Sequence, residues 1–262
     1  ALGCGVIYRK KGAPVAHTTA IKRLEDVRNL EMPDNFWESP LLKAQLLTVE
    51  RMVQHFGREV FLIGRGDQGP FSLASQLYGM DRLLEDLMDE DAEEDIRRLL
   101  NFCTRACIAY HERLLLLGVP MTSMGDSTAG PDVISPAMYE TFAMPYEKQV
   151  IEAVHRKGGL ISLHICGNAT KIIDKMCSLG ADVLEIDQKT DLEAAVRAAE
   201  GKCALLGQIN PVLLSGGTQQ EVKAAAERIL GITGGKNATG FILGPGCALG
   251  GDTPKENIHA ML

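Results

Sequence analysis

The sequence has no surplus of positive charge and no long hydrophobic run. Its 262 residues include 27 Lys and Arg against 34 Asp and Glu, which gives a formal net charge of −7. A negative balance of this kind argues against a general nucleic-acid-binding surface. The longest apolar runs, such as LLLLGV from Leu114, are far shorter than the ~20 residues needed to span a bilayer. We therefore expect neither nucleic acid nor a membrane as a partner.

The sequence also lacks the paired cysteine spacing of a disulfide framework. It contains seven cysteines, an odd number, scattered along the chain. This usage indicates reduced thiols in a cytoplasmic protein. Low-complexity tracts, internal repeats and domain linkers are missing as well, so we predict a single domain over residues 1–262. Because the sequence begins with Ala1 and not with methionine, we expect the natural protein to extend further toward its N-terminus.

Short apolar runs alternate with segments of helical periodicity, which is typical of a parallel sheet covered by helices. The predicted strands are Val60–Ile63, Val119–Met124, Leu160–His164, Asp182–Ile186, Cys203–Gln208 and Phe241–Gly244. The predicted helices are Ser72–Met80, Asp91–Leu117, Pro136–Lys157, Thr170–Leu179, Leu192–Glu200 and Gln219–Thr233. The pattern favours an α/β fold of the (β/α)8 TIM-barrel type, which needs eight strands. We expect the hairpin-like start, Gly5–His17, and a strand before Ala1 to supply the missing two.

The stretch SLHICGN ends a predicted strand with two side chains that can bind metal. His164 and Cys166 are separated by one residue, so both project from the same face of the strand. They lie at its carboxyl end, where parallel sheets and barrels carry their chemistry. Taken alone, the pair is better explained by two core residues at the mouth of a sheet, because cysteine is among the most buried residue types.

A third candidate ligand follows another predicted strand. Cys247 lies in the glycine-rich stretch FILGPGCALGGDTP, directly after Phe241–Gly244. One histidine and two cysteines at the same edge of a sheet suit Zn²⁺. Three protein ligands with an open fourth position are typical of a catalytic zinc site and not of a structural one. The sequence therefore predicts a zinc site formed by His164, Cys166 and Cys247.

Two other patterns resemble functional motifs but have simpler explanations. Cys103, Cys107 and His111 are spaced four residues apart, which predicts a buried seam along a long helix. The segment GRGDQG, Gly64–Gly69, has the spacing of a dinucleotide-binding loop. No acidic residue ends a second strand about 20 residues later, as binding of the ribose would require, because the next predicted strand begins at Val119. We interpret this segment as a loop between a strand and a helix that has Pro70 in its first turn.

Polar side chains follow several of the predicted strands and would line the same edge of the sheet. Each can be an ordinary turn-former or helix cap. As a set, they would form a polar mouth around the metal ligands. The predicted catalytic residues are Asp126, Asp187 and Gln208, and the predicted cofactor-binding residues are Asp67, Gln68 and Asn210.

Several longer stretches together resemble the uroporphyrinogen decarboxylase superfamily. They are GPFSLAS, ISPAMYETFAMPY, HICGN, GADVLEID, LLGQINP and LGPGCALGGDTPKENI, in this order along most of the chain. The resemblance implies a (β/α)8 barrel whose N-terminal segment and first strand are not included in this chain. The true decarboxylases of this superfamily use no metal and bind a tetrapyrrole with the help of a late histidine. Cys247 stands at the position of that histidine.

The cobalamin-dependent methyltransferases form the other branch of the superfamily. Their His-x-Cys…Cys zinc motif corresponds to His164, Cys166 and Cys247. This branch implies Zn²⁺ as a cofactor, a separate corrinoid protein as a partner, and a small-molecule methyl donor or acceptor such as a thiol. Asp126, Asp187 or Asp67 would occupy the open zinc position at rest. The alternatives are a uroporphyrinogen decarboxylase and a non-catalytic corrinoid- or tetrapyrrole-binding module.

Overall fold

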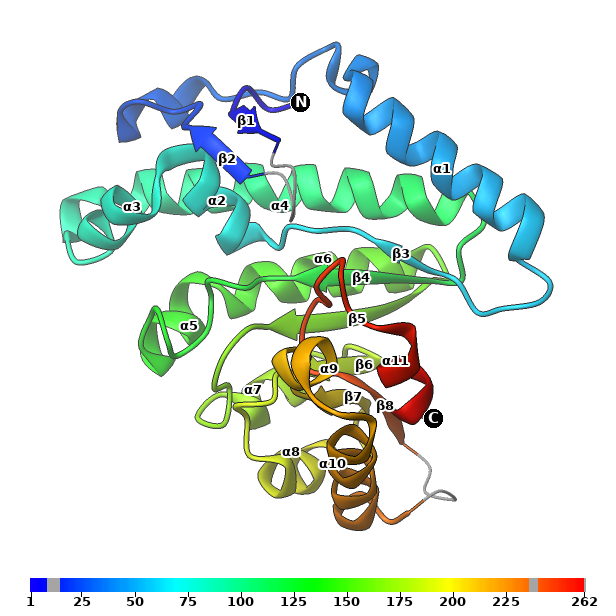
Figure 1. Ribbon diagram of the computed structural model, residues 1–262. Coiled ribbons are helices and arrows are strands. Elements are labelled where there is room, and N and C mark those ends of the chain that lie inside the picture. Colours follow the sequence, from blue (N-terminus) through cyan, green and yellow to red (C-terminus); the bar gives the residue numbers. More distant parts are fainter. Residues whose placement is uncertain (9–14, 236–239, 262) are drawn as a thin grey trace. The chain divides into compact units, whose positions relative to one another are not determined.

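The computed structural model describes residues 1–8, 15–235 and 240–261, and these group into two compact units (Figure 1). Unit 1 comprises Ala1–Asp126 and Thr141–Ile161, and unit 2 comprises Ser127–Glu140 and Ser162–Leu262. The single domain predicted for residues 1–262 stays a prediction.

Unit 1 contains the first part of the alternating strand and helix pattern. Its elements are β1 (Gly5–Ile7), β2 (Val15–Thr18), the 3-10 helices η1 (Leu24–Asn29), η2 (Phe36–Glu38) and η3 (Glu90–Ala92), α1 (Pro40–Phe56), β3 (Ile63–Arg65), α2 (Pro70–Tyr78), α3 (Met80–Asp86), α4 (Glu93–Leu116), β4 (Met121–Gly125) and α6 (Met144–Arg156). Strands β3 and β4 pair in parallel, with Gly64 opposite Thr122. Helix α4 packs against both α2 and α6.

Helix α2 follows β3 directly and shows why GRGDQG forms a connecting loop. Gly69 is its N-cap residue and Pro70 lies in its first turn, where a missing N–H costs no hydrogen bond. The first free N–H groups of the helix find an acceptor far along the chain. The carboxylate of Asp126 accepts hydrogen bonds from the N–H groups of Phe71, at 3.1 Å, and Ser72, at 2.6 Å. The interpretation of this segment as a strand-to-helix loop is confirmed.

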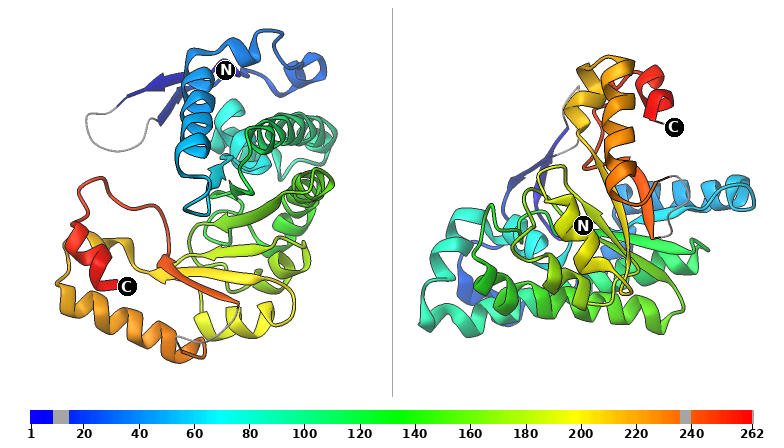
Figure 2. Two further views of the ribbon diagram at one scale, coloured as in Figure 1. Left: turned by 90° about the vertical axis from the view of Figure 1, so that its right-hand side faces the viewer. Right: turned by 90° about the horizontal axis from the view of Figure 1, so that it is seen from below.

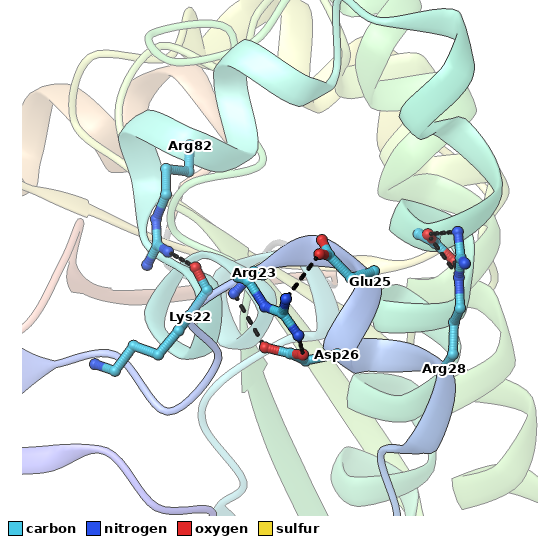
Figure 3. Close-up of polar contacts among 7 residues, drawn as sticks. Lys22, Arg23, Glu25, Asp26, Arg28 and Arg82 are labelled. Carbon is cyan, nitrogen blue, oxygen red and sulfur yellow. Dashed lines mark hydrogen bonds and ion pairs between the residues drawn. The ribbon is translucent and has the colours of Figure 1, made fainter.

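Ion pairs fix η1 to the long helix α4. The guanidinium of Arg28 binds the carboxylate of Asp95 on α4 through two nitrogens, with contacts of 3.0 Å and 2.6 Å. Within the segment, Arg23 pairs with Asp26 at 2.7 Å, as Figure 3 shows. Bidentate arginine–carboxylate contacts fix the relative orientation of the two side chains better than single hydrogen bonds do. This contact connects residues that are 67 positions apart in the sequence.

Unit 2 contains the second half of the alternating pattern. Its elements are β5 (Leu160–Ile165, from Ser162 onward), α7 (Ile173–Ser178), β6 (Val183–Ile186), α8 (Leu192–Ala199), β7 (Ala204–Ile209), α9 (Pro211–Gly216), α10 (Gln219–Ile232), β8 (Phe241–Pro245) and α11 (Lys255–Met261), and most of α5 (Pro136–Phe142) lies in it. The strands are parallel in the order β5-β6-β7-β8. Helices α9, α10 and α11 pack together, and the two views of Figure 2 show α10 beside α11.

The parallel order places the carboxyl ends of β5 to β8 at one edge of the sheet. Cys166 follows β5, Asp187 follows β6, Asn210 follows β7 and Gly246 follows β8. Capping residues fix the points at which the helices that follow this edge begin. The Asp191 carboxylate caps α8 through the N–H of Ala194, and the Asn210 side chain caps α9. The edge therefore consists of short loops held between fixed strands and capped helices.

Three expectations from the sequence need correction. The start of the chain forms a separate two-stranded antiparallel sheet of β1 and β2, so it supplies no strand to the parallel sheet; residues 9–14 of this hairpin lie outside the described residues. The helix predicted over Pro136–Lys157 breaks at Ala143, because Pro145 cannot donate the backbone hydrogen bond that would continue it. Helix α1 was not predicted, and none of its residues is buried.

The six predicted parallel strands are confirmed as β3 to β8, with ends shifted by up to three residues. All six predicted helical segments contain helix, and α7 begins at Ile173 instead of Thr170. Within the described residues, none of the helices has the length and apolar character needed to cross a membrane.

Candidate metal centre

His164, the second-last residue of β5, is buried among the strands of unit 2. Its side chain is 3 % exposed, and Cys166, two residues later, is partly exposed. The chain turns at Gly167, whose φ of +82° favours glycine. A Cβ at this position would also lie 2.2 Å from the Asp132 carboxylate. The sequence HICG thus holds two ligand-type side chains on one face and reverses direction directly after them.

Cys247 reaches the same place from the loop after β8. Its Sγ lies 3.8 Å from Sγ of Cys166 and 3.6 Å from Nε2 of His164, and Nε2 lies 3.2 Å from Sγ of Cys166. A tetrahedral zinc with Zn–S of about 2.3 Å and Zn–N of about 2.0 Å has S–S and N–S edges of about 3.8 Å and about 3.5 Å. Two of the observed edges match these lengths, and the third is shorter by a few tenths of an ångström.

The imidazole of His164 is oriented for binding a metal through Nε2. Its Nδ1 lies 2.8 Å from the backbone carbonyl oxygen of Glu185, the residue opposite His164 on β6. A carbonyl can only accept, so Nδ1 carries the hydrogen and the neutral ring presents a lone pair at Nε2. Metal-binding histidines in proteins commonly donate their second N–H in this way. The contact with Glu185 therefore selects the tautomer in which Nε2 can bind a metal beside the two cysteines.

The two thiols affect the ionisation of their neighbours because they lie so close together. The pKa of Cys247 is raised to about 12, first by its contact with the Cys166 thiol and against the lowering effect of His164. Burial lowers the pKa of His164, but contacts with the Cys247 thiol and the Glu185 carbonyl outweigh it and leave the pKa raised. Two adjacent thiolates need a positive charge between them, which a coordinated cation provides. The donor set and its electrostatics fit a soft or borderline cation such as Zn²⁺.

Asp187 and Gln208, two predicted catalytic residues, lie in the same unit and contact the backbone around the ligands. The carboxylate of Asp187 accepts hydrogen bonds from the N–H groups of Gly167, at 2.9 Å, and Lys189, at 3.0 Å. The side-chain amide of Gln208 donates to the carbonyl of Asp187 at 3.1 Å. Asn210 caps α9 through the N–H of Val212, at 2.8 Å. The predicted catalytic and cofactor-binding roles of these residues stay predictions.

The other predicted site residues, Asp67, Gln68 and Asp126, lie in unit 1. Asp67 forms an ion pair with Arg65 and accepts a hydrogen bond from the N–H of Gly125 at 2.7 Å. Asp126 is fully buried, and burial raises its pKa to about 6 against the lowering effect of the hydrogen bonds from Ser72 and Phe71. Each of the three residues thus has side-chain or backbone contacts within unit 1. Their catalytic and cofactor-binding roles stay predictions.

Helix α4 carries the buried seam that the sequence predicts, formed by residues four positions apart: Cys103, Cys107 and His111. All three are buried along α4, and burial raises the pKa of both thiols. His111 bonds through Nδ1 to the Thr122 hydroxyl at 2.8 Å, and Cys107 donates to the Gln68 carbonyl at 3.0 Å. Within the part of the chain that the structure describes, only His164, Cys166 and Cys247 bring three ligand atoms within 4.8 Å of one another.

Sequence reasoning missed two residues beside the metal-binding group. Glu185 provides the carbonyl for His164, and its carboxylate accepts a hydrogen bond from the hydroxyl of Ser162. Thr190 contacts the turn after Cys166 through its hydroxyl. The signal for Glu185 was a charged residue inside the apolar run VLEI. Thr190 gave no comparable signal, because a threonine before a helix cap is common.

Comparisons with known proteins find a matching family and relatives along the whole chain. The model of the family described as uroporphyrinogen decarboxylase (URO-D) matches residues 1–262. The methylcobamide:CoM methyltransferase MtbA of Methanosarcina mazei is 31% identical over 265 residues, covering 99% of this chain and 74% of that protein. The methylcobamide:CoM methyltransferase MtaA of Methanosarcina barkeri is 26% identical, covering 100% and 74%. A uroporphyrinogen decarboxylase of Synechococcus sp. is 26% identical over 247 residues, covering 90% and 63%.

A solved structure matches the fold of the whole chain. The structure of a methyltransferase from Methanosarcina mazei superimposes with a TM-score of 0.89, covering 99% of this chain and 74% of that one. The two sequences are 22% identical, so this match concerns the fold. It confirms the α/β fold class predicted from the alternating strands and helices.

Proposed function

Because this chain belongs to the uroporphyrinogen decarboxylase (URO-D) family, and because three ligand-type side chains meet in unit 2, we propose that it is a zinc-dependent methyltransferase. It transfers a methyl group between a corrinoid carried by a partner protein and a small thiol. The observation that carries the proposal is the cluster of His164 Nε2 with the Sγ atoms of Cys166 and Cys247. The methylcobamide methyltransferases among its relatives support the corrinoid.

The residues of the cluster have distinct tasks in this proposal. Cys166 and Cys247 bind zinc as thiolates, and His164 binds through Nε2 while the Glu185 carbonyl holds its Nδ1–H. Zinc held by these residues would supply the Lewis acidity that keeps a substrate thiol ionised at neutral pH. The thiol proton leaves to solvent before the methyl group moves.

The methyl transfer itself takes place between the two substrates. The thiolate sulfur attacks the methyl carbon of the methylated corrinoid, so an S–C bond forms and the Co–C bond breaks. The electron pair of the broken bond stays on cobalt, which changes from Co(III) to Co(I). The reverse reaction uses the same residues, with Co(I) taking the methyl group from a donor. CoM, the thiol in the names of the Methanosarcina relatives, is the first acceptor to test.

Cys247 favours methyl transfer over tetrapyrrole decarboxylation. The decarboxylases that the sequence resembles have a histidine at this position and bind no metal there. In this chain a cysteine stands there, within 3.8 Å of a second thiol and 3.6 Å of an imidazole. A decarboxylase has no use for such a soft donor set, whereas a thiol-activating zinc site requires one. The cytoplasmic location inferred from the cysteine usage belongs to the same proposal.

Metal content tests the first part of the proposal. The chain is purified without added metal and its metals are measured by mass spectrometry, beside the variants His164→Ala and Cys247→Ser. We expect about one zinc per chain, as for other single catalytic zinc sites, and its loss in both variants. The control Cys107→Ser changes a buried thiol of unit 1 and retains the zinc. Equal zinc content in all four proteins would show that the ligand assignment is wrong.

Methyl transfer tests the second part. Methylcobalamin and CoM are mixed anaerobically with the zinc-loaded chain, and the spectral change to cob(I)alamin is followed. We expect turnover by the parent chain and by Cys107→Ser but not by His164→Ala. Zinc binding without turnover, with the corrinoid still bound, would favour the binding-module alternative. Metal-independent decarboxylation of uroporphyrinogen would overturn the proposal in favour of the decarboxylase.

A further inference from the structure

The turn after Cys166 is held by side chains that do not bind the metal themselves. We infer that Asp187 and Thr190, from the loop between β6 and α8, are positioning residues that hold Cys166 in its ligating place. This inference rests on the proposed zinc site. It assigns to Asp187 a role that differs from direct participation in catalysis or ligation.

Both backbone polar groups of Gly167 are bound by these two side chains. Its N–H donates to Asp187 Oδ2 at 2.9 Å, and its carbonyl accepts from the Thr190 hydroxyl at 3.2 Å. The same hydroxyl oxygen accepts from the N–H of Ala169 at 3.1 Å. Asp187 is 5 % exposed and Thr190 is 4 % exposed, so water does not compete well for these bonds. Three hydrogen bonds therefore fix the residues that directly follow Cys166.

Gln208 fixes the loop from the other side. Its side-chain amide donates to the backbone carbonyls of both Asp187 and Thr190. The N–H of Thr190 also donates to the Asp187 carbonyl at 3.0 Å, which closes the loop into a turn. Gln208 is 7 % exposed. The two positioning side chains thus project from a turn that is anchored to β7.

The same turn also supports the loop that carries Cys247. A Cβ at Gly246 would lie 2.6 Å from the backbone nitrogen of Gln188, so only glycine fits against the turn without a shift. The N–H of Gly246 donates to the carbonyl of Ile209 on β7 at 2.7 Å. Both cysteine loops therefore rest on residues 187–190.

The geometry separates positioning from ligation. Each carboxylate oxygen of Asp187 accepts a backbone N–H, and no oxygen of Asp187 belongs to the described group of ligand atoms within 4.8 Å of one another. Replacing Asp187 by asparagine keeps the shape but provides one acceptor oxygen and one NH₂ donor. The NH₂ group then faces one of the two N–H groups, and one of the two hydrogen bonds is lost.

Asp191 offers a matched control four residues further along. Its carboxylate caps α8 by accepting from the N–H of Ala194 at 2.9 Å, and asparagine caps helices as well as aspartate does. The same substitution, with the same change of charge in the same loop, should therefore leave the Cys166 turn intact. Thr190→Val and Thr190→Ser form a second matched pair, because serine keeps the hydroxyl that valine removes.

The test measures metal binding in the full chain with three readouts besides activity. Zinc affinity is measured by competition with a chromophoric chelator, the thiolate-to-cobalt absorption is recorded after Co²⁺ substitution, and hydrogen exchange is measured over residues 166–170. We expect Asp187→Asn and Thr190→Val to weaken zinc binding by about 10- to 100-fold, as losses of outer-shell partners do. Their cobalt spectra change and their turn exchanges faster. Asp191→Asn and Thr190→Ser match the parent chain in all three measurements.

The outcomes distinguish this inference from the proposed function. If the parent chain binds zinc and Asp187→Asn matches Asp191→Asn in affinity and cobalt spectrum, the positioning role is wrong and the zinc site stands. If the parent chain binds no zinc, the proposed function fails and the inference fails with it. Should Asp187→Asn not fold, the Thr190 pair decides: loss of affinity in Thr190→Val with recovery in Thr190→Ser supports positioning, and equal affinity overturns it.

Discussion

Asp126 and His111 are two buried side chains of unit 1 whose pKa values are displaced in opposite directions. Burial raises the pKa of Asp126 from its usual 3.8 to about 6, against hydrogen bonds from Ser72 and Phe71 that lower it. Burial lowers the pKa of His111 from its usual 6.5 to about 4, against a contact with the Gly66 backbone that raises it. The two displacements cover the same range of pH, so we expect their effects on stability to oppose each other there.

The sign and size of each effect follow from proton linkage. Between about pH 4 and pH 6, folded Asp126 keeps a proton that the unfolded chain releases, so the free energy of unfolding falls as the pH rises. Over the same range, unfolded His111 binds a proton that the folded chain excludes, so the free energy of unfolding rises with pH. Each displacement of a little over two units corresponds to about 3 kcal/mol. The two contributions therefore nearly cancel in the parent chain.

Single variants should reveal the two slopes. Relative to the parent chain, Asp126→Asn is expected to gain about 3 kcal/mol of stability as the pH rises from about 4 to about 6, because only the histidine contribution remains. His111→Gln is expected to lose a similar amount over the same range. The double variant should return to the slope of the parent. Lost hydrogen bonds lower the stability of each variant, but this cost is nearly the same at every pH, and only slopes are compared.

Urea unfolding at a series of pH values measures these slopes, and hydrogen exchange of α4 amides reports on unit 1 in particular. If both single variants follow the parent profile, Asp126 and His111 titrate at ordinary values and the reasoning from burial is refuted. The same samples provide a test of the site. Retention of the parent's zinc content and methyl transfer in Asp126→Asn would leave Asp126 with the helix-capping task alone.

Three further predictions concern single contacts. Gly246→Ala should weaken zinc binding, measured by chelator competition, because the added Cβ would lie 2.6 Å from the Gln188 nitrogen. A zinc affinity equal to that of the parent chain would show that the loop adjusts freely. Thr218→Ala removes the capping box that Thr218 and Glu221 form on α10, and should cost about 1 kcal/mol in urea unfolding while zinc content stays constant. Cys107→Ser should keep parent zinc content by mass spectrometry, since burial holds the pKa of this thiol high, and loss of zinc would reveal a ligand that the structure does not indicate.

Strands β4 and β5 were predictable because they are apolar runs of nearly continuous burial, whereas only one residue is buried in each of β3 and β8. In β5, five of six residues are buried, and all five residues of β4 are. Helix α1 was missed although Leu42, Leu46, Val49 and Val53 recur along its sequence at the spacing of one helical face. None of its residues is buried, so this apolar face does not belong to the core of unit 1. The break at Ala143 was visible in principle, since Pro145 interrupts an otherwise continuous helical pattern.

The ligands of the candidate site were predictable for a chemical reason. A histidine and two cysteines at strand ends stand out because few other residue types bind metal so well. Their neighbours did not stand out. Thr190 contacts the turn through its hydroxyl, and Glu185 contacts His164 through a backbone carbonyl, a group that every residue carries. Which of these groups meets the ligands depends on strand register, and a single sequence does not specify register.

Asp187 and Gln208 lie at strand ends, where a polar side chain can take part in catalysis or hold the framework of a site. Both follow the pattern of catalytic residues, being polar and placed at the carboxyl edge of a parallel sheet. Their hydrogen bonds run to backbone groups of Gly167, Lys189 and the turn that ends at Thr190. Cys166 and Cys247, the proposed cysteine ligands, are 81 residues apart. Among the described residues, the group of candidate ligand atoms includes none from β6 or β7, the strands between β5 and β8. A turn from these middle strands contacts both cysteine loops and can set the spacing of the two sulfurs. If Asp187 and Thr190 position Cys166 as we infer, polar residues after β6 and β7 are required for the site even though the proposed ligands follow β5 and β8.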